Sequence, residues 1–171
     1  MRVSLPIEPD ARGRRIGLVV SRYHHSIVDR LADGAASVFV KAGGEDRDLL
    51  RIDAPGAFEL PVIAATLLRR GDVDAVVTVG LVLTGETTHD RYICESVAHA
   101  LQELSIETGK PAAFGVITCQ TLAQAEARSG GAKGNKGEEA MTAALLAVSA
   151  VRAAREVPGR RRPPIGRSQE S

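Results

Sequence analysis

Four apolar runs in this chain are each followed by a polar turn and then by a stretch with helical periodicity, and this alternation limits the possible folds more than any other feature. Strands that alternate with helices form a parallel sheet, because right-handed crossovers pack each helix back onto the sheet. The first run is apolar throughout, as expected for a strand buried on both faces of such a sheet. The expected strands are residues 16–20, 49–52, 73–80 and 112–118, and the expected helices are residues 27–42, 59–70, 88–107, 121–128 and 138–156. The pattern predicts an α/β fold, a three-layer sandwich around a four-stranded parallel sheet.

The two ends of the chain differ in composition from the part between them. Residues 1–15 are polar and rich in proline and arginine, which predicts an extended N-terminal arm, and residues 3–7 within it have the composition of a short edge strand. Residues 158–171 are rich in Arg, Pro and Ser, which predicts a disordered basic tail. So short a run of arginines favours a solvated tail over a nucleic-acid-binding one. Residues 16–157 then form one domain of ordinary size.

The composition excludes several classes of function. Lys and Arg total 22 against 21 for Asp and Glu, so binding to nucleic acid or to an anionic membrane is not expected, and any anion site must be local. The N-terminus lacks the long apolar core of a signal peptide, and no apolar run is long enough to span a membrane, which predicts a cytoplasmic protein. Cys94 and Cys119 are not spaced as a CxxC pair, so neither a zinc site nor a redox dithiol is expected.

The segment from Gly80 to Asp90 joins a predicted strand to a predicted helix. The free N–H groups and the dipole at a helix start favour an anion, and the hydroxyl groups of Thr87 and Thr88 can add donors. His89 is the only side chain of the segment whose unperturbed pKa allows proton transfer near neutral pH. The alternative is that Thr87 or Thr88 merely caps the helix, with Asp90 in its first turn to complement the dipole. Taken alone, the spacing favours the cap, because helix caps are far commoner than catalytic sites.

Two more motifs follow predicted strands and therefore belong to the same rim, since ligands of parallel sheets bind beyond the carboxyl ends of the strands. They are Tyr23 and the pair Phe58-Glu59. Aromatic residues make up only 3% of the chain, so a ring beside a polar motif is a candidate for ring recognition. Two rings, a carboxylate and a helix start suit a planar polar heterocycle next to a phosphate. Taken singly, core packing explains Phe58 and a favourable first-turn charge explains Glu59.

Three segments in register resemble the signature segments of the lumazine synthase family. They are Pro-Gly-Ala-Phe-Glu-Leu-Pro at 55–61, Gly-Glu-Thr-Thr-His at 85–89 and Gly-Asn-Lys-Gly at 134–137, and the likeness covers about residues 14–156. The resemblance implies a flavodoxin-like four-stranded sheet, a catalytic domain over residues 16–157, and no metal or organic cofactor. It also implies condensation of 5-amino-6-(D-ribitylamino)uracil with 3,4-dihydroxy-2-butanone 4-phosphate to 6,7-dimethyl-8-ribityllumazine. This reaction releases phosphate and water and is the penultimate step of riboflavin biosynthesis.

The resemblance also assigns roles position by position. Tyr23 matches the aromatic residue that stacks on the pyrimidine, and His89 matches the proton-transfer residue. Other matches to positions that hold or lie near the pyrimidine and its ribityl chain are Ala57, Phe58, Glu59, Leu81, Val82, Leu83 and Lys136. Matches to the phosphate site are Gly85, Glu86, Thr87 and Arg128. An arginine suits phosphate because its permanently charged fork matches phosphate oxygens.

Phe114 matches a ring that the neighbouring subunit contributes in this family. It lies inside the fourth predicted strand and not at its carboxyl end, so it can reach such a site only if two chains share that site. The resemblance implies a homo-oligomer with the pentamer as its basic unit, in which residues 3–7 add a strand to a neighbour's sheet. Some members close into icosahedral shells of twelve pentamers, and riboflavin synthase is a candidate partner.

Some positions depart from the family pattern. Thr84 stands where many members carry arginine, and Tyr23 stands where phenylalanine or tryptophan is usual. The loop 130–133 has the length found in shell-forming members but places its lysine differently. His24 and His25 have no family role and are expected to be solvated loop residues.

Two other classes of function compete with the enzyme. One is a flavin-binding, lumazine-binding or shell-forming scaffold of the same fold, and the other is an unrelated flavodoxin-like phosphate binder. The presence of Glu59, His89 and Arg128 together favours the enzyme, because a scaffold does not need a proton donor.

Overall fold

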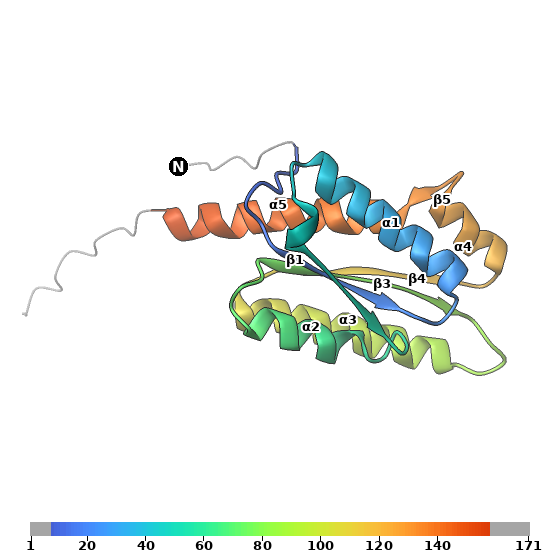
Figure 1. The fold of residues 1–171 in the computed structure, drawn as a ribbon. Helices are drawn as coiled ribbons and strands as arrows, with labels where there is room; N and C mark the ends of the chain where they lie inside the picture. The colour runs from blue at the N-terminus through green and yellow to red at the C-terminus, as the bar shows by residue number, and fades with distance from the viewer. Residues whose placement is uncertain (1–7, 158–171) are drawn as a thin grey trace, which may run out of the picture.

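A four-stranded parallel sheet in the order β2-β1-β3-β4 forms the centre of the computed structural model, which describes residues 8–157 (Figure 1). The strands are β1 (Ile16–Ser21), β2 (Leu49–Ala54), β3 (Ala75–Leu83) and β4 (Ala112–Cys119). All three neighbouring pairs are parallel. Every residue of β1 is buried and β3 is buried up to its last residue, whereas β2 and β4, at the two edges, are partly exposed. The predicted parallel sheet is confirmed.

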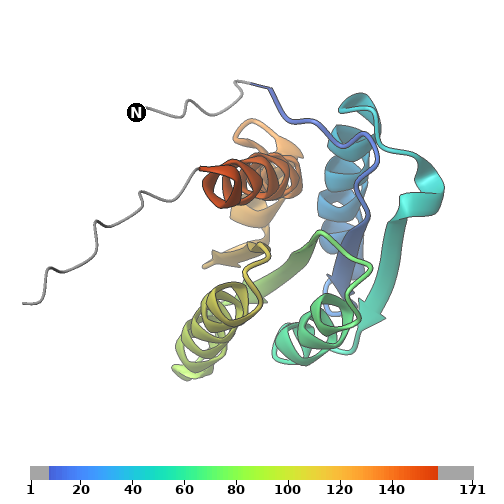
Figure 2. The same cartoon turned by 90° about the vertical axis from the view of Figure 1, so that its left-hand side faces the viewer.

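Helices cover both faces of this sheet (Figure 2). The helices on one face are α1 (His25–Lys41) and α5 (Lys136–Glu156), and those on the other are α2 (Leu60–Arg69) and α3 (His89–Thr108). The shorter elements are a 3-10 turn η1 (Asp46–Asp48), the helix α4 (Leu122–Arg128) and the strands β5 (Ser129–Gly131) and β6 (Gly134–Asn135). The fold is therefore the predicted flavodoxin-like three-layer α/β/α sandwich.

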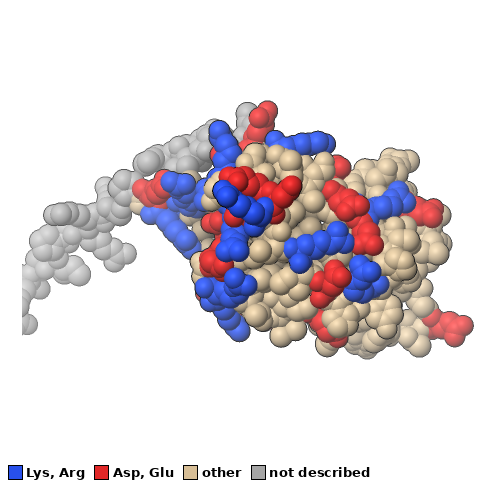
Figure 3. Space-filling view, viewed as in Figure 1, with Lys and Arg blue, Asp and Glu red and all other residues tan. Residues whose placement is uncertain are grey.

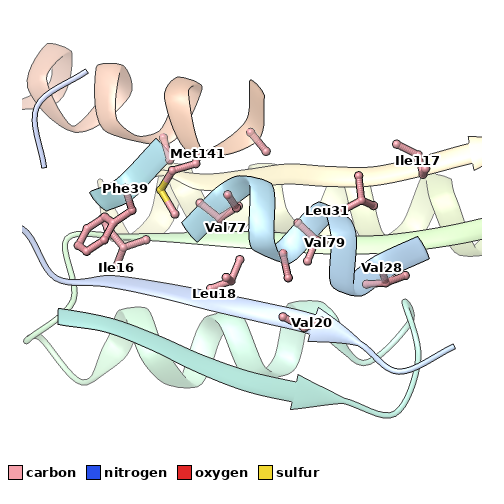
Figure 4. Packing of buried hydrophobic residues seen from close by; sticks show 14 of the residues in the cluster. Ile16, Leu18, Val20, Val28, Leu31, Phe39, Val77, Val79, Ile117 and Met141 are labelled. Carbon is pink, nitrogen blue, oxygen red and sulfur yellow. The ribbon is translucent and has the colours of Figure 1, made fainter. Parts of the chain in front are cut away.

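Each face of the sheet has its own apolar core. On the face of α1 and α5, Phe39, Leu31 and Met141 pack over Val77 and Val79 of the sheet (Figure 4). Side chains of this size each contribute about 1.5–3 kcal/mol when fully buried. The two cores hold the strands in one layer, so that the turns after β1, β2 and β3 all lie at the carboxyl end of the sheet.

The strand β3 ends later than predicted. The sequence predicts a strand end at Gly80, yet β3 continues to Leu83, which pairs with Cys119 of β4. Gly80 permits close packing instead, because a Cβ at this position would lie 3.3 Å from the Cβ of Ser21. The prediction was wrong because pairing with β4 extends the strand beyond its glycine. The turn that leads to α3 therefore begins only at Thr84.

The glycine-rich segment 129–137, predicted as a loop, contains an antiparallel hairpin formed by β5 and β6. The helix α5 begins at Lys136 and not at Glu138. Asn135 is the N-cap of this helix, and its side-chain oxygen accepts hydrogen bonds from the N–H groups of Gly137 and Glu138 at 2.8 and 3.3 Å. This cap satisfies two of the free donors of the first turn, which explains the earlier start.

The same asparagine joins α5 to α1. Its side-chain nitrogen donates to the carbonyl of Arg30 at 2.8 Å, and the side chain of Asn135 rests on Gly34. A side chain on Gly137 would collide with the carbonyl of Leu31. The Gly-Asn-Lys-Gly motif is thus largely a packing device between two helices, and Lys136 is its one side chain available for other contacts.

Outside the sandwich, residues 8–15 contact the C-terminal end of α1. Ala11 is fully buried, and its N–H donates to the carbonyl of Ala42 at 2.9 Å. The edge strand predicted at residues 3–7 and the tail predicted at 158–171 lie outside the described residues. Lys and Arg side chains are interspersed with Asp and Glu over the face shown in Figure 3. None of the helices within residues 8–157 has the length and hydropathy needed to cross a membrane.

Replacing Gly137 tests the contact between α1 and α5. We expect Gly137→Ala to lower the free energy of unfolding by about 1–3 kcal/mol, because the added methyl group overpacks a rigid backbone contact. Gly85→Ala is the matched control, since its Cβ would meet nothing within 4 Å. Thermal and chemical unfolding measure both variants. Equal stability of the two variants would contradict the packing role of Gly137.

Candidate active site

A cavity of about 510 Å³ opens at the carboxyl ends of β1, β2 and β3, and we call it the rim pocket. The turns after these three strands supply most of its wall. Its lining residues are Tyr23, His24, Gly56, Ala57, Phe58, Glu59, Leu81, Val82, Leu83, Gly85, Thr87, His89, Asp90 and Ile93. The structure thus brings together most of the site residues that the sequence predicts.

The aromatic residues of the rim pocket are not part of the core. Tyr23 and Phe58 are 69% and 61% exposed, so core packing does not explain either ring. Glu59 occupies the N-cap position of α2 without a side-chain capping bond. A Cβ on Gly56 would lie 3.0 Å from the Glu59 carboxylate and 3.3 Å from the Tyr23 ring. A carboxylate and a ring therefore converge over a glycine that leaves space between them.

The turn from β3 to α3 forms another wall of the rim pocket. Leu81 and Val82 are buried and supply an apolar floor. Thr88 is the N-cap of α3 but makes no side-chain capping hydrogen bond, so the capping alternative for Thr87 and Thr88 is not what the structure shows. His89, the first residue of α3, is exposed and lines the pocket. Glu86 is exposed and lies outside the lining.

The lining of the rim pocket carries no permanent positive charge. Its lining includes the carboxylates of Glu59 and Asp90 but neither Lys nor Arg. An anion held there by this chain alone would depend on N–H groups, on the Thr87 hydroxyl and on two imidazoles. The pocket by itself suits a polar ring better than a phosphate.

The cations that the sequence assigns to the site lie in a second cavity. This edge pocket, of about 410 Å³, runs along the outer strand β4 and the helices α4 and α5. Its lining residues are Phe114, Gly115, Val116, Ile117, Thr118, Arg128, Lys136, Glu139, Ala140 and Ala143. It shares no lining residue with the rim pocket. Within one chain, Phe114, Arg128 and Lys136 therefore lie in a different cavity from most of the other predicted site residues.

The two cations of the edge pocket are held in place by neighbours on their own helices. The Lys136 ammonium pairs with the Glu139 carboxylate at 2.7 Å. The Arg128 guanidinium donates to the carbonyl of Gln124 at 3.0 Å. Burial raises the pKa of the nearby Cys119 thiol, and the charge of Arg128 partly offsets this effect. One bond to Gln124 leaves most of the five guanidinium N–H donors of Arg128 available for a ligand.

His24 is one of four lining residues of the rim pocket, with Gly56, Asp90 and Ile93, that the sequence did not assign to the site. It was expected to be a solvated loop residue, and it is exposed, but it also lines the rim pocket, whereas His25 does not. Its backbone is left-handed, with φ of 55°, the only positive φ at a non-glycine residue within 8–157. Its place directly after a strand end was the available signal. Over the same residues, no cluster of three or more His, Cys, Asp or Glu side chains could hold a metal ion.

Fold and pocket define the class: a flavodoxin-like α/β protein with a pocket at the carboxyl end of its sheet. The family model described as 6,7-dimethyl-8-ribityllumazine synthase matches residues 13–152. A 6,7-dimethyl-8-ribityllumazine synthase of Aquifex aeolicus is 45% identical over 79% of this chain and 88% of the relative. One of Streptomyces coelicolor is 42% identical over 83% and 88%, and one of Thermus thermophilus 40% over 79% and 86%. The chain belongs to the 6,7-dimethyl-8-ribityllumazine synthase family.

Tyr23 offers a test of the rim pocket with a matched control. We expect Tyr23→Leu to raise the KM for the ribitylaminopyrimidine about threefold to tenfold, because an aromatic pair contributes about 0.5–1.5 kcal/mol beyond its buried area. Tyr92 is also 69% exposed but lines neither pocket, so Tyr92→Leu should leave this KM unchanged. Steady-state kinetics measure both variants, and equal KM values would remove Tyr23 from the site.

Proposed function

We propose that this chain forms its product at a site that two adjacent subunits complete. The chain is a transferase of riboflavin biosynthesis. It condenses 5-amino-6-(D-ribitylamino)uracil with 3,4-dihydroxy-2-butanone 4-phosphate to 6,7-dimethyl-8-ribityllumazine, with release of phosphate and water. The observation that supports a shared site is the division of the site residues between two cavities.

Each cavity lacks one component of the proposed site: the rim pocket is lined by no Lys or Arg, and the edge pocket is lined by no histidine. The rim pocket has His89 and two rings, and the edge pocket has Arg128, Lys136 and Phe114, which is 43% exposed. If the edge pocket of one subunit faces the rim pocket of the next, a phosphate gains a permanent cation and the heterocycle gains a second ring. Such a contact joins two different surfaces, and a rotation that closes produces a ring of subunits. The family resemblance implies five subunits for such a ring, and we take a homo-pentamer as the basic unit on that ground.

The pyrimidine substrate suits the rim pocket. The ring of Tyr23 stacks on the pyrimidine, while Glu59 and the backbone at Ala57 and Phe58 bind its polar edges. The ribityl chain lies along Leu81–Leu83, which extend beyond Val79, the last residue of β3 that pairs with β1. Backbone groups on that side of the strand bind the ribityl hydroxyls. These contacts orient the amine of the pyrimidine toward the second substrate.

The butanone phosphate lies between the turn before α3 and the neighbour's cations. Gly85, Glu86 and Thr87 offer backbone N–H groups near a helix start, which suits a phosphate. For Glu86 this role belongs to its backbone, because its carboxylate would repel the anion. The guanidinium of Arg128 binds phosphate oxygens through two parallel hydrogen bonds, and Lys136 adds a second positive charge nearby.

The chemistry needs proton transfers and a fixed geometry. The amine attacks the ketone carbonyl, and the adduct loses water to give an imine. Loss of a proton from the adjacent hydroxyl-bearing carbon then expels phosphate from the terminal carbon and leaves an enol. The enol takes up a proton on its terminal carbon to become a methyl ketone, and the ribitylamino nitrogen attacks this new carbonyl and closes the second ring with loss of water. His89 carries protons to the departing oxygens and from the attacking nitrogens, because an imidazole can both donate and accept a proton and His89 lines the pocket. Holding both substrates in one cavity supplies the remaining acceleration. We infer a cytoplasmic location and riboflavin synthase as the consumer of the product.

His89 is tested by rate measurements against a histidine of the same helix. We expect His89→Ala to lower kcat by about 10²-fold or more without abolishing turnover, because general acid–base catalysis contributes about 10²–10⁴-fold. His99 is exposed on α3 and lines neither pocket, so His99→Ala should keep the wild-type rate. The absorbance of the lumazine product reports both rates. A wild-type rate no faster than the reaction in buffer would instead support the scaffold alternative.

The shared site is tested by mixing two damaged subunits. His89→Ala damages the rim pocket and Arg128→Ala the edge pocket, so either homo-oligomer lacks an intact site. Co-expression of both variants with different tags, followed by purification on both tags, should restore about a quarter of the wild-type activity, because one in four head-to-tail contacts then joins two intact halves. Activity no higher than the sum of the two separate variants would mean that each subunit builds its site alone.

A further inference from the structure

The turn between β3 and α3, which carries His89, is anchored through Thr84. The N–H of Thr84 donates to the carbonyl of Cys119 at 2.9 Å, which continues the pairing of β3 with β4. Its hydroxyl donates to the Asp90 carboxylate at 3.0 Å. One residue thus links the end of the sheet to the first turn of α3.

Between these two anchors the turn has few fixed contacts. Gly85, Glu86 and Thr87 are exposed, and among residues 8–157 none of them donates or accepts a hydrogen bond. A Cβ on Gly85 would meet no atom within 4 Å, so side-chain packing does not hold the turn at this point. The Thr88 side chain does not cap α3. The bond between Thr84 and Asp90 is therefore what closes the turn across its base.

At an ordinary helix start, a carboxylate in the position of Asp90 interacts with its own helix. A carboxylate in the first turn can accept the free N–H groups of that turn and satisfy them. Here the carboxylate instead accepts the Thr84 hydroxyl, and the N–H groups of residues 85–88 stay available to a ligand. Asp90 is half-buried and lines the rim pocket directly after His89, so its position and that of the imidazole are coupled along the helix.

We propose that Thr84 is a positioning residue for this reaction: its hydroxyl holds Asp90, and through it the first turn of α3, so that His89 and the free N–H groups of the turn face the rim pocket. The inference rests on the proposed role of His89. A displacement of about 1 Å at a reacting group can cost about 10²-fold in rate, so one hydrogen bond that holds the turn matters more for kcat than for stability.

Removing only the hydroxyl tests the proposal. Thr84→Val keeps the shape of the side chain, and we expect it to lower kcat about tenfold with little change in the melting temperature. Thr84→Ser retains the donor and should restore kcat. Thr66 is an exposed threonine of α2 whose hydroxyl donates to the carbonyl of Val62 at 2.9 Å, and it lines neither pocket. Thr66→Val therefore controls for the loss of a surface hydroxyl and should keep the wild-type kcat.

A double-mutant cycle tests the route through Asp90. If the hydroxyl acts through this carboxylate, Thr84→Val should have little further effect on kcat in the Asp90→Ala background, whereas independent effects would multiply. A wild-type kcat for Thr84→Val, or full multiplication in the cycle, would overturn the proposal. Failure of the proposed function would give a different result from failure of the Thr84 proposal, because the wild-type protein itself would then form no product above the buffer rate.

Discussion

Burial of β1 and β3 on both faces is the constraint on which the rest of the structure depends. Strands without a polar face need a helix layer on each side, and parallel strands need crossovers that return every chain segment to the same end. The turns after β1, β2 and β3 therefore gather at one rim, although Tyr23, Phe58 and His89 are far apart in sequence. The rim pocket is a direct consequence of how the apolar strands are covered.

The strand β4 lies at the edge of the sheet, and none of its residues lines the rim pocket. An edge strand exposes its outer side, and Phe114 is therefore available to another molecule and not to the rim pocket of its own chain. The Asn135 cap and the tight contact of Gly137 with α1 hold Lys136 beside the same strand. A motif that looks like ligand recognition in sequence is thus mainly the packing that presents one lysine beside the edge strand.

Some parts of the site could be predicted from sequence and others could not, for different physical reasons. Tyr23, Glu59 and His89 could be predicted as site residues because each follows a recognisable strand or begins a recognisable helix. The continuation of β3 to Leu83 was missed because it depends on pairing with β4, which local sequence does not encode. The role of His24 in the pocket wall was missed because the sequence places His24 and His25 in the same expected loop. In the structure His25 begins α1, and only His24 lines the pocket.

By itself, the sequence determined the α/β sandwich, the order of its elements and the rim at which the ligand site lies, because periodicity and turn residues are local properties of the chain. Only the tertiary structure decided that the site residues fall into two cavities, since this separation depends on which strand occupies the edge. It also decided that Asp90 accepts the Thr84 hydroxyl and does not cap its own helix. Such choices between partners depend on distances across the fold, which no spacing in the sequence specifies.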